Sequence, residues 1–158
     1  LKLIRYPILI FCMAKVFEIA ITQNFKGKME TVNNINIIAG KGIMGDRYFK
    51  ENNDKKNQIT LIEKENIDYF NKLNNTQIKS VEFRRNIITE EVRLNELVGK
   101  VFSLGNVKLK GIDLCRPCKN LQETLKQKNL IKEFLRKGGL RCEIIKDGKI
   151  SVGDEIKF

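Results

Sequence analysis

The residues best suited to chemistry are two cysteines two positions apart, in the segment Cys115-Arg116-Pro117-Cys118. A β-segment is predicted to end there and a helix to begin. The backbone N–H groups and the helix dipole at such a junction favour a thiolate, and the positive charges of Arg116 and Lys119 act in the same direction. We therefore expect Cys118 to be a low-pKa thiolate able to ligate a metal, carry a persulfide or act as a redox thiol. An isolated pair of this spacing is equally compatible with two inert cysteines.

The absence of histidine restricts the chemistry further, because the 158 residues include none. This excludes Ser-His-Asp and Cys-His nucleophile pairs, imidazole bases and histidine-ligated metal. A zinc site needs four ligands, and neither a second Cys-x-x-Cys nor a histidine pair is present. A thioredoxin-like redox pair needs a βαβ context that the pattern does not predict. An enzyme built from this chain would use cysteine, carboxylates, lysine, arginine or a cofactor.

Two further motifs are suited to anions. Arg84-Arg85-Asn86 lies within a strand predicted over residues 81–88, where alternation places Arg84 and Asn86 on one face and Arg85 on the other. Arginine with asparagine can hold a phosphate or the edge of a heterocycle, although a solvated strand face would show the same residues. Asp46-Arg47 follows a glycine-rich loop that could close over an anionic ligand. No Walker spacing is present.

The charge is strongly basic, since 30 Lys and Arg against 19 Asp and Glu give a net charge of +11. Between residues 119 and 141, seven cations oppose two glutamates, a local excess of 7 − 2 = +5. Such a stretch attracts nucleic acid or an anionic cofactor, but it is also typical of a solvated helix face. No aromatic residues interleave with the cations as a base-stacking surface requires. We therefore rank a nucleic-acid-binding barrel below a function that depends on Cys118.

The elements that must position these residues are mostly short strands. Strands are predicted over 16–22, 29–32, 35–38, 58–62, 81–88, 101–104, 107–114 and 140–145, with further β-elements over 150–152 and 155–158. Helices are predicted over 63–73, over 120–125 with a capping box from Asn120 to Glu123, and over 129–135 with Gly138-Gly139 as its C-cap. This pattern predicts a mainly β (α+β) fold, a compact closed β-barrel with a few short helices.

The first twelve residues stand apart from this pattern. Their apolar run is far shorter than the roughly 20 residues of a membrane span. We interpret residues 1–12 as an N-terminal extension or a mis-assigned start ahead of Met13, and residues 13–158 as a single domain. We expect a cytoplasmic protein without membrane contact, because four cysteines in a chain of this size need not form disulfides.

The motifs occur together and in a fixed order, and this order resembles that of the MOSC family, named for the C-terminal domain of molybdenum cofactor sulfurases. The series is Gly45-Asp46-Arg47, Gln58 to Ile62, Arg84-Arg85-Asn86-Ile87, Leu97 to Lys100, Cys115 to Cys118, Gly138-Gly139-Leu140 and Gly153-Asp154. The resemblance runs from about Gly40 to Phe158 and implies a closed barrel similar to the β-barrel of pyruvate kinase. The Arg-Arg-Asn strand and the late Cys-x-x-Cys are its most specific parts.

The resemblance also implies a cofactor and roles for residues. In relatives such as the mitochondrial amidoxime-reducing component, a cysteine ligates molybdenum, and Cys118 matches that position whereas Cys115 does not. Arg84, Arg85 and Asn86, with Asp46 and Arg47, match positions expected to hold the molybdenum cofactor (molybdopterin). Soft molybdenum suits a thiolate, and the cofactor supplies the remaining ligands. Sulfurases also bind pyridoxal phosphate, but on a separate domain, so we do not expect it here.

Two functions follow from the resemblance. The first is reduction of N-hydroxylated compounds at a Cys118-ligated molybdenum, with a small-molecule substrate and an electron-donor protein. The second is a carrier without redox activity, which holds a persulfide on Cys118, received from a sulfur-donor protein, or transfers the cofactor. Both use the same thiolate, so the sequence does not separate them.

Overall fold

The computed structural model describes residues 13–158, and most of its regular structure is in strands. One set of strands is β1 (Lys15–Ile21), β2 (Glu30–Val32), β5 (Ile59–Glu63), β6 (Ile87–Glu90), β7 (Val101–Leu104), β8 (Val107–Leu114), β9 (Leu140–Lys146) and β11 (Ile156–Lys157). The other set is β3 (Asn34–Ile38), β4 (Gly42–Ile43) and β10 (Gly148–Ser151). The α-helices are α1 (Lys64–Asn74), α2 (Lys119–Thr124) and α3 (Leu130–Glu133), and short 3-10 helices cover Lys55–Asn57, Ser80–Phe83 and Leu94–Leu97. The expected mainly β fold with a few short helices is confirmed.

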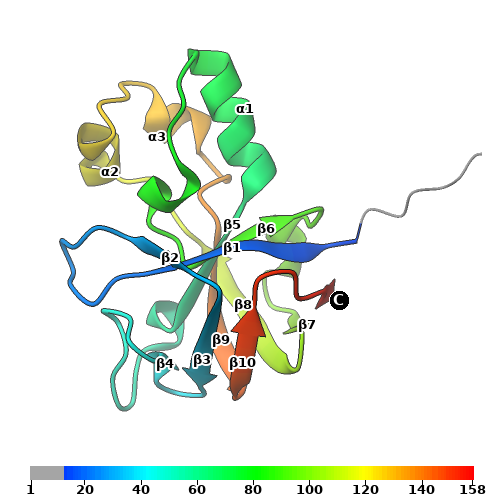
Figure 1. The fold of residues 1–158 in the computed structure, drawn as a ribbon. Helices are drawn as coiled ribbons and strands as arrows, with labels where there is room; N and C mark the ends of the chain where they lie inside the picture. The colour runs from blue at the N-terminus through cyan, green and yellow to red at the C-terminus, as the bar shows by residue number, and fades with distance from the viewer. Residues whose placement is uncertain (1–12) are drawn as a thin grey trace, which may run out of the picture.

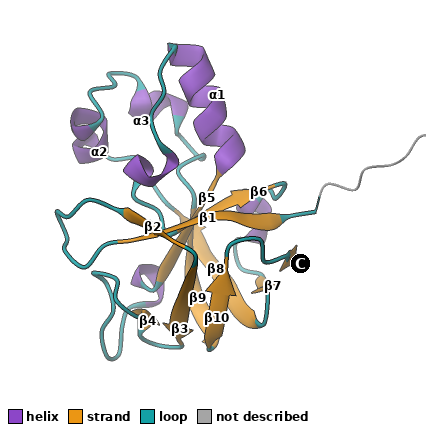
Figure 2. Ribbon diagram, viewed as in Figure 1, coloured by secondary structure: helices purple, strands orange, loops and turns teal. Residues whose placement is uncertain are grey.

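The strands form two sheets. The larger sheet has eight strands in the order β11-β7-β8-β9-β5-β6-β1-β2, and the smaller has three in the order β10-β3-β4. All neighbours are antiparallel except β5 and β6, which are parallel and joined through α1. The three helices gather at one end of the molecule and the smaller sheet lies at the other (Figures 1 and 2).

The expected closed barrel is wrong, because β2 and β11 are free edges of the larger sheet. Only an isolated bridge between Lys15 and Glu155, with a few backbone hydrogen bonds beside it, joins β1 to the segment that leads into β11. Closure would need a continuous ladder between edge strands. It fails because β11 is two residues long and because the chain leaves the larger sheet after β2 to pair as β3 with β10 and β4.

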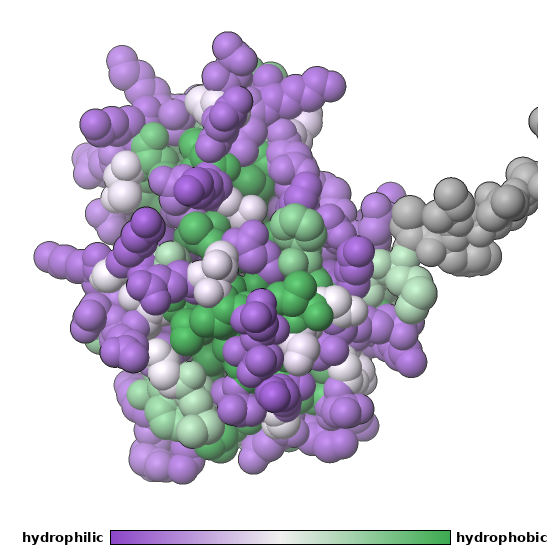
Figure 3. Space-filling model, in the orientation of Figure 1, coloured by the Kyte–Doolittle hydropathy of each residue, from purple (hydrophilic) through white to green (hydrophobic). Residues whose placement is uncertain are grey.

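Two apolar clusters lie on opposite faces of β5 and β6. Leu61 and Ile87 belong to the cluster enclosed by the sheets, whereas their neighbours Ile62 and Ile88 belong to the cluster under the helices. Each strand therefore carries two adjacent apolar residues whose side chains point to opposite faces of the sheet. On the surface, Figure 3 shows apolar residues toward the middle of one face with hydrophilic residues around them.

The strand predicted over residues 81–88 is wrong in its first half. The segment Ser80–Phe83 is a 3-10 helix, held by the Glu82 carboxylate, which accepts a hydrogen bond from the Lys79 N–H at 2.8 Å. Phe83 packs against Phe134 in the helical cluster, with ring centroids 4.9 Å apart. Arg84 is left-handed, with a φ of 59°, so the strand begins only at Ile87. The predicted alternation of Arg84 and Asn86 on one strand face therefore does not apply.

Two predicted helix boundaries are also wrong. Helix α2 already begins at Lys119 with Cys118 as its N-cap, ahead of the expected cap at Asn120. Helix α3 ends at Glu133 with Phe134 as its C-cap, so Gly138 and Gly139 cap no helix. They serve a close approach instead, because a Cβ on Gly138 would lie 2.4 Å from the Cys115 carbonyl oxygen and a Cβ on Gly139 would lie 2.1 Å from that of Leu61.

The remaining expectations concern the membrane and the first residues. No helix in the part of the chain from residue 13 onward is long and apolar enough to span a bilayer. The interpretation of residues 1–12 lies outside the described residues.

Candidate functional site

A hollow forms where the beginnings of β5 and β9 meet the end of β8 and the residues just before β6. We call it the cationic hollow. Its lining residues are Arg47, Tyr48, Lys56, Asn57, Thr60, Arg84, Arg85, Asn86, Cys115, Arg116, Cys118 and Arg141. Six of these are lysine or arginine, and none of the residues that line it is acidic. Sheet register brings them together, since Arg141 lies opposite Thr60 on one side and Asp113 on the other.

Cys118 is the exposed thiol of this hollow. Its Sγ accepts a hydrogen bond from the Leu121 N–H at 3.4 Å, as the N-cap of α2. The expected position of Cys118, between the end of a strand and the start of a helix, is thus confirmed.

The other two described cysteines are buried. Cys115 lies at the base of the hollow, 3% exposed, and its N–H donates to the Gly139 carbonyl at 2.7 Å. Burial raises the pKa of the Cys142 thiol well above its usual range, and Cys115 adds to the shift. All three described cysteines are free thiols.

This contrast predicts selective alkylation. At pH 8 in the native protein, we expect iodoacetamide to modify Cys118 at least about tenfold faster than Cys115 or Cys142, because only an accessible thiolate reacts. Peptide mass spectrometry over a time course measures the rates, and the same reaction in urea is the control in which the difference should vanish. Equal native rates would contradict the burial of Cys115 and Cys142.

All three side chains of the Arg84-Arg85-Asn86 motif form hydrogen bonds to the protein itself. Arg84 donates to the carbonyls of Gly27 at 2.7 Å and Phe25 at 2.9 Å. Arg85 donates to those of Gly138 at 2.9 Å and Phe83 at 3.2 Å. These guanidiniums hold loops against the hollow, and neither forms an ion pair with a carboxylate of residues 13–158, so both add positive charge to it. Burial lowers the pKa of Arg84, and the positive charge of Arg47 lowers it further.

Asn86 joins strands rather than pointing a free amide outward. It is 4% exposed, its Oδ1 accepts from the Thr60 hydroxyl at 3.0 Å, and its Nδ2 donates to the Ala20 carbonyl at 3.3 Å. The Thr60 hydroxyl also accepts from the Asn86 N–H at 3.1 Å. Asn86 therefore positions the floor of the hollow.

Asp46 and Arg47 take different places. Arg47 lines the hollow, whereas Asp46 does not. The Asp46 carboxylate is buried, where it accepts from the Thr22 N–H at 3.2 Å and from Arg47 Nη1 at 3.3 Å. The Arg47 guanidinium also lies 4.7 Å from the centre of the Tyr48 ring. Asp46 thus orients Arg47, and Arg47 supports Tyr48 at the rim.

From the sequence, Arg116 was noted only for its charge beside Cys118, and none of Arg116, Arg141 and Lys56 was identified as a residue that could bind an anion. The side chains of Arg116 and Arg141 make no hydrogen bond or ion pair with any other described residue, and Lys56 pairs only with Asp113, at 3.0 Å. Arg141 carried no motif signal of its own and was counted only within the basic stretch. Its place in the hollow follows from β9 lying between β5 and β8, a register that the sequence does not reveal.

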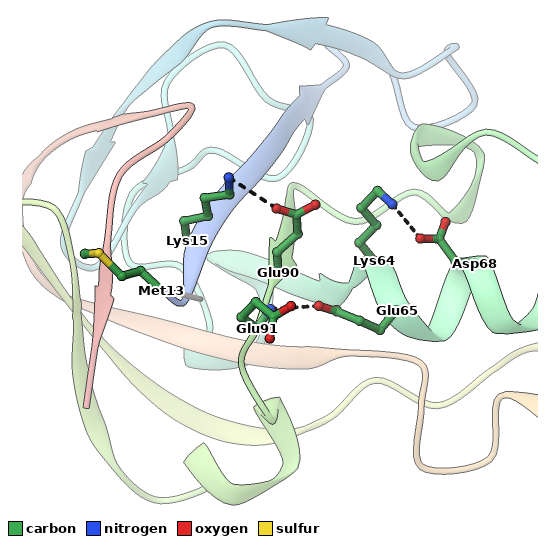
Figure 4. Close-up of a pocket in the computed structure, with 7 residues that line it drawn as sticks. All are labelled: Met13, Lys15, Lys64, Glu65, Asp68, Glu90 and Glu91. Atoms are coloured by element: carbon green, nitrogen blue, oxygen red, sulfur yellow. Dashed lines mark hydrogen bonds and ion pairs between the residues drawn. The ribbon is translucent and has the colours of Figure 1, made fainter. Parts of the chain in front are cut away.

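A second hollow, between β1, α1 and β6, has ion pairs among its own lining residues. Figure 4 shows Lys15 paired with Glu90 and Lys64 with Asp68, while Glu65 accepts from the Glu91 N–H at 2.7 Å. Its two lysines face four carboxylates, and neither Glu65 nor Glu91 pairs with a cation of the described chain, so this hollow is acidic and does not suit an anionic ligand.

The donor set of the cationic hollow limits what it can hold. No group of three or more cysteine, aspartate or glutamate side chains within residues 13–158 could hold a metal ion by itself. The hollow offers one exposed sulfur, a soft ligand, within a cationic wall. This fits a soft metal that brings its other ligands in an anionic cofactor.

Comparison with known proteins agrees with the fold. A sequence model of the MOSC domain matches residues 40–157. Similar solved structures include the YUAD protein from Bacillus subtilis, with a TM-score of 0.79, 18% identity, and coverage of 91% of this chain and 94% of that one. YiiM from Geobacillus stearothermophilus has a TM-score of 0.69 and 13% identity, with coverage of 91% and 74%. YiiM from Escherichia coli has a TM-score of 0.67 and 16% identity, with coverage of 91% and 67%. No protein of curated function matches the chain significantly.

Proposed function

The chain belongs to the MOSC domain family, and from that premise we propose that it binds the molybdenum cofactor in the cationic hollow with the Cys118 thiolate as a molybdenum ligand. The observation that carries the proposal is the exposed Cys118 sulfur in a hollow lined by six cations and no carboxylate. The family is associated with this cofactor. Its phosphate and dithiolene are anionic and match the cations that line the hollow. Its metal is soft and matches the Cys118 sulfur.

The residues of the chain divide the work. Cys118 would ligate the metal, because its sulfur is exposed and accepts only the Leu121 N–H. Arg141 would bind the phosphate, since it lines the hollow and pairs with no other described residue, and Lys56, which is paired with Asp113, would add positive charge beside it. Arg84, Arg85 and Asn86 would hold the surrounding loops in place through the contacts described above.

When bound, the cofactor would supply two-electron reduction of an N-hydroxylated compound, with its oxygen released as water. The two electrons would come from a donor protein and the two protons from water, while the described residues would bind the substrate and keep Cys118 oriented. We place the protein in the cytoplasm, because a reducing compartment keeps Cys118 available to the metal.

The carrier function uses the same sulfur without reduction. In that case Cys118 would hold a persulfide received from a sulfur-donor protein, or the chain would pass the cofactor to another protein. Mass spectrometry separates the persulfide carrier from the reductase. A stable increase of about 32 Da on Cys118 with no bound pterin supports the persulfide carrier.

The direct test is the molybdenum and pterin content of protein purified from a host that makes the cofactor. We expect close to one molybdenum and one pterin per chain. Protein that carries neither after such expression would contradict the proposal. Salt-dependent binding to an arbitrary DNA duplex, with no cofactor bound, would instead support nucleic acid as the partner.

Arg141, whose side chain pairs with no other described residue, gives a further prediction. In Arg141→Gln, we expect cofactor affinity to fall at least about tenfold, because one charge-assisted hydrogen bond contributes roughly 1.5–3 kcal/mol. The measurement is the dissociation constant of added cofactor.

Arg93→Gln is the matched control for Arg141→Gln. It removes the same charge at an exposed position that pairs with Glu96, and Arg93 does not line the cationic hollow. Its dissociation constant should equal that of the unmodified protein. An equal loss in both variants would mean that overall charge, rather than Arg141, is responsible.

A further inference from the structure

A second concave surface adjoins the cationic hollow across the Cys115–Pro117 segment. We call it the Pro117 groove. Its lining residues are Asp113, Leu114, Cys115, Arg116, Pro117, Ile131, Leu135 and Arg136. Cys115 and Arg116 also line the cationic hollow, so the two surfaces share one wall.

The middle of this groove is apolar and open to solvent. Leu135 is 67% exposed and Ile131 is 37% exposed, and both lie beside Pro117 and Leu114. Covering large exposed aliphatic side chains with an apolar part of a ligand removes them from water and lowers the free energy. The groove has a volume of about 490 Å³, within the range of roughly 300–1,000 Å³ typical of small-molecule sites.

The charge at the rim of the groove indicates which polar group a ligand of this groove would carry. Its acidic residue, Asp113, is neutralised by Lys56 at 3.0 Å. The guanidiniums of Arg116 and Arg136 form no ion pair with a carboxylate of the described chain, so the net charge at the rim is positive. A ligand with an apolar body and an anionic head therefore fits both features.

From these observations we propose that the Pro117 groove binds a small amphipathic anion, apolar body against Leu135 and Ile131, anionic head at Arg116 and Arg136. Arg116 would place that head at the entrance to the cationic hollow, toward Cys118. That this molecule is the substrate rests on the function proposed above; that the groove binds it does not.

The binding can be tested without any cofactor. The probe is 8-anilinonaphthalene-1-sulfonate, which joins an apolar ring system to one anion, and the protein is the full chain made without molybdenum. We expect saturable fluorescence enhancement with one site per chain. Leu135→Asn should weaken binding at least about fivefold. The probe would bury roughly half of the Leu135 side chain, and a polar amide in its place loses that apolar contribution to binding.

Leu73→Asn is the matched control, since Leu73 is 52% exposed on α1 and does not line the groove. It should leave probe affinity unchanged, and circular dichroism should show that both variants fold. Absence of saturable binding, or equal weakening in the two variants, would overturn the proposal.

The anionic preference has its own pair of measurements. Arg136→Gln should weaken the sulfonate probe several-fold and leave its uncharged analogue, N-phenyl-1-naphthylamine, unaffected. Equal effects on both probes would overturn the assigned head group. Bound sulfonate probe should also slow alkylation of Cys118 by iodoacetamide several-fold, and an unchanged rate would overturn the orientation toward Cys118.

These outcomes are separable from those of the proposed function. Probe binding in a protein that never acquires molybdenum would leave the groove assigned and the cofactor proposal refuted. A molybdenum-loaded protein whose groove binds no probe would do the reverse.

Discussion

Cys118→Ser will purify with at least about tenfold less molybdenum than the unmodified protein from the same host. A hard hydroxyl replaces the soft sulfur, and even partners one step removed from a metal change its affinity by roughly 10–100-fold. The fold should survive, because serine is a preferred N-cap and its hydroxyl can accept the Leu121 N–H that Cys118 accepts now. Metal analysis and far-ultraviolet circular dichroism, on the same preparations, measure the two effects.

The matched control for this variant is Cys115→Ala. Cys115 lines the same hollow but is 3% exposed, so we expect this variant to retain its molybdenum. Equal molybdenum in Cys118→Ser and the unmodified protein would contradict the proposed ligand. A loss in Cys115→Ala alone would move the ligand to the other end of the motif.

Gly139→Ala should lower the free energy of unfolding by about 3 kcal/mol. Gly139 has a φ of +108°, a conformation that side chains disfavour, and its added Cβ would lie 2.1 Å from the Leu61 carbonyl oxygen. Backbone strain of this kind costs roughly 1–3 kcal/mol, and the contact adds to it because Leu61 belongs to the central strand β5. Urea unfolding monitored by circular dichroism measures the change.

Gly40→Ala provides a control for conformation without crowding. Gly40 also has a positive φ, +75°, but its added Cβ meets nothing within 4 Å. We expect it to cost only about 1 kcal/mol. If the two variants lose the same stability, crowding against β5 is not the reason for glycine at position 139.

The Gly139 variant should also affect the site. The Cys115 N–H donates to the Gly139 carbonyl, so displacement of this residue loosens the segment that carries the cysteine pair. We expect faster alkylation of Cys115 in Gly139→Ala than in Gly40→Ala. The fold and the cationic hollow therefore both depend on Gly139.

Several features of this chain followed from the sequence alone. Periodicity located β1, β5, β7, β8, β9 and α1, because alternating or continuous apolar runs reflect local burial. The order of motifs indicated the MOSC family, which the match over residues 40–157 confirmed. The place of Cys118 between a strand and a helix was also visible, since both neighbouring elements are local.

Tertiary structure decided the rest, because it depends on contacts between distant residues. The segment around Arg84 has the composition of a strand, but burial of Phe83 against Phe134 bends it into a 3-10 turn. Closure of the sheet depended on where β3 finds its partners, and Arg141 entered the hollow through the register of β9 against β5 and β8. Pairing partners and register are set by the packing of the whole chain, so local residue patterns determine which strands form but not which side chains meet.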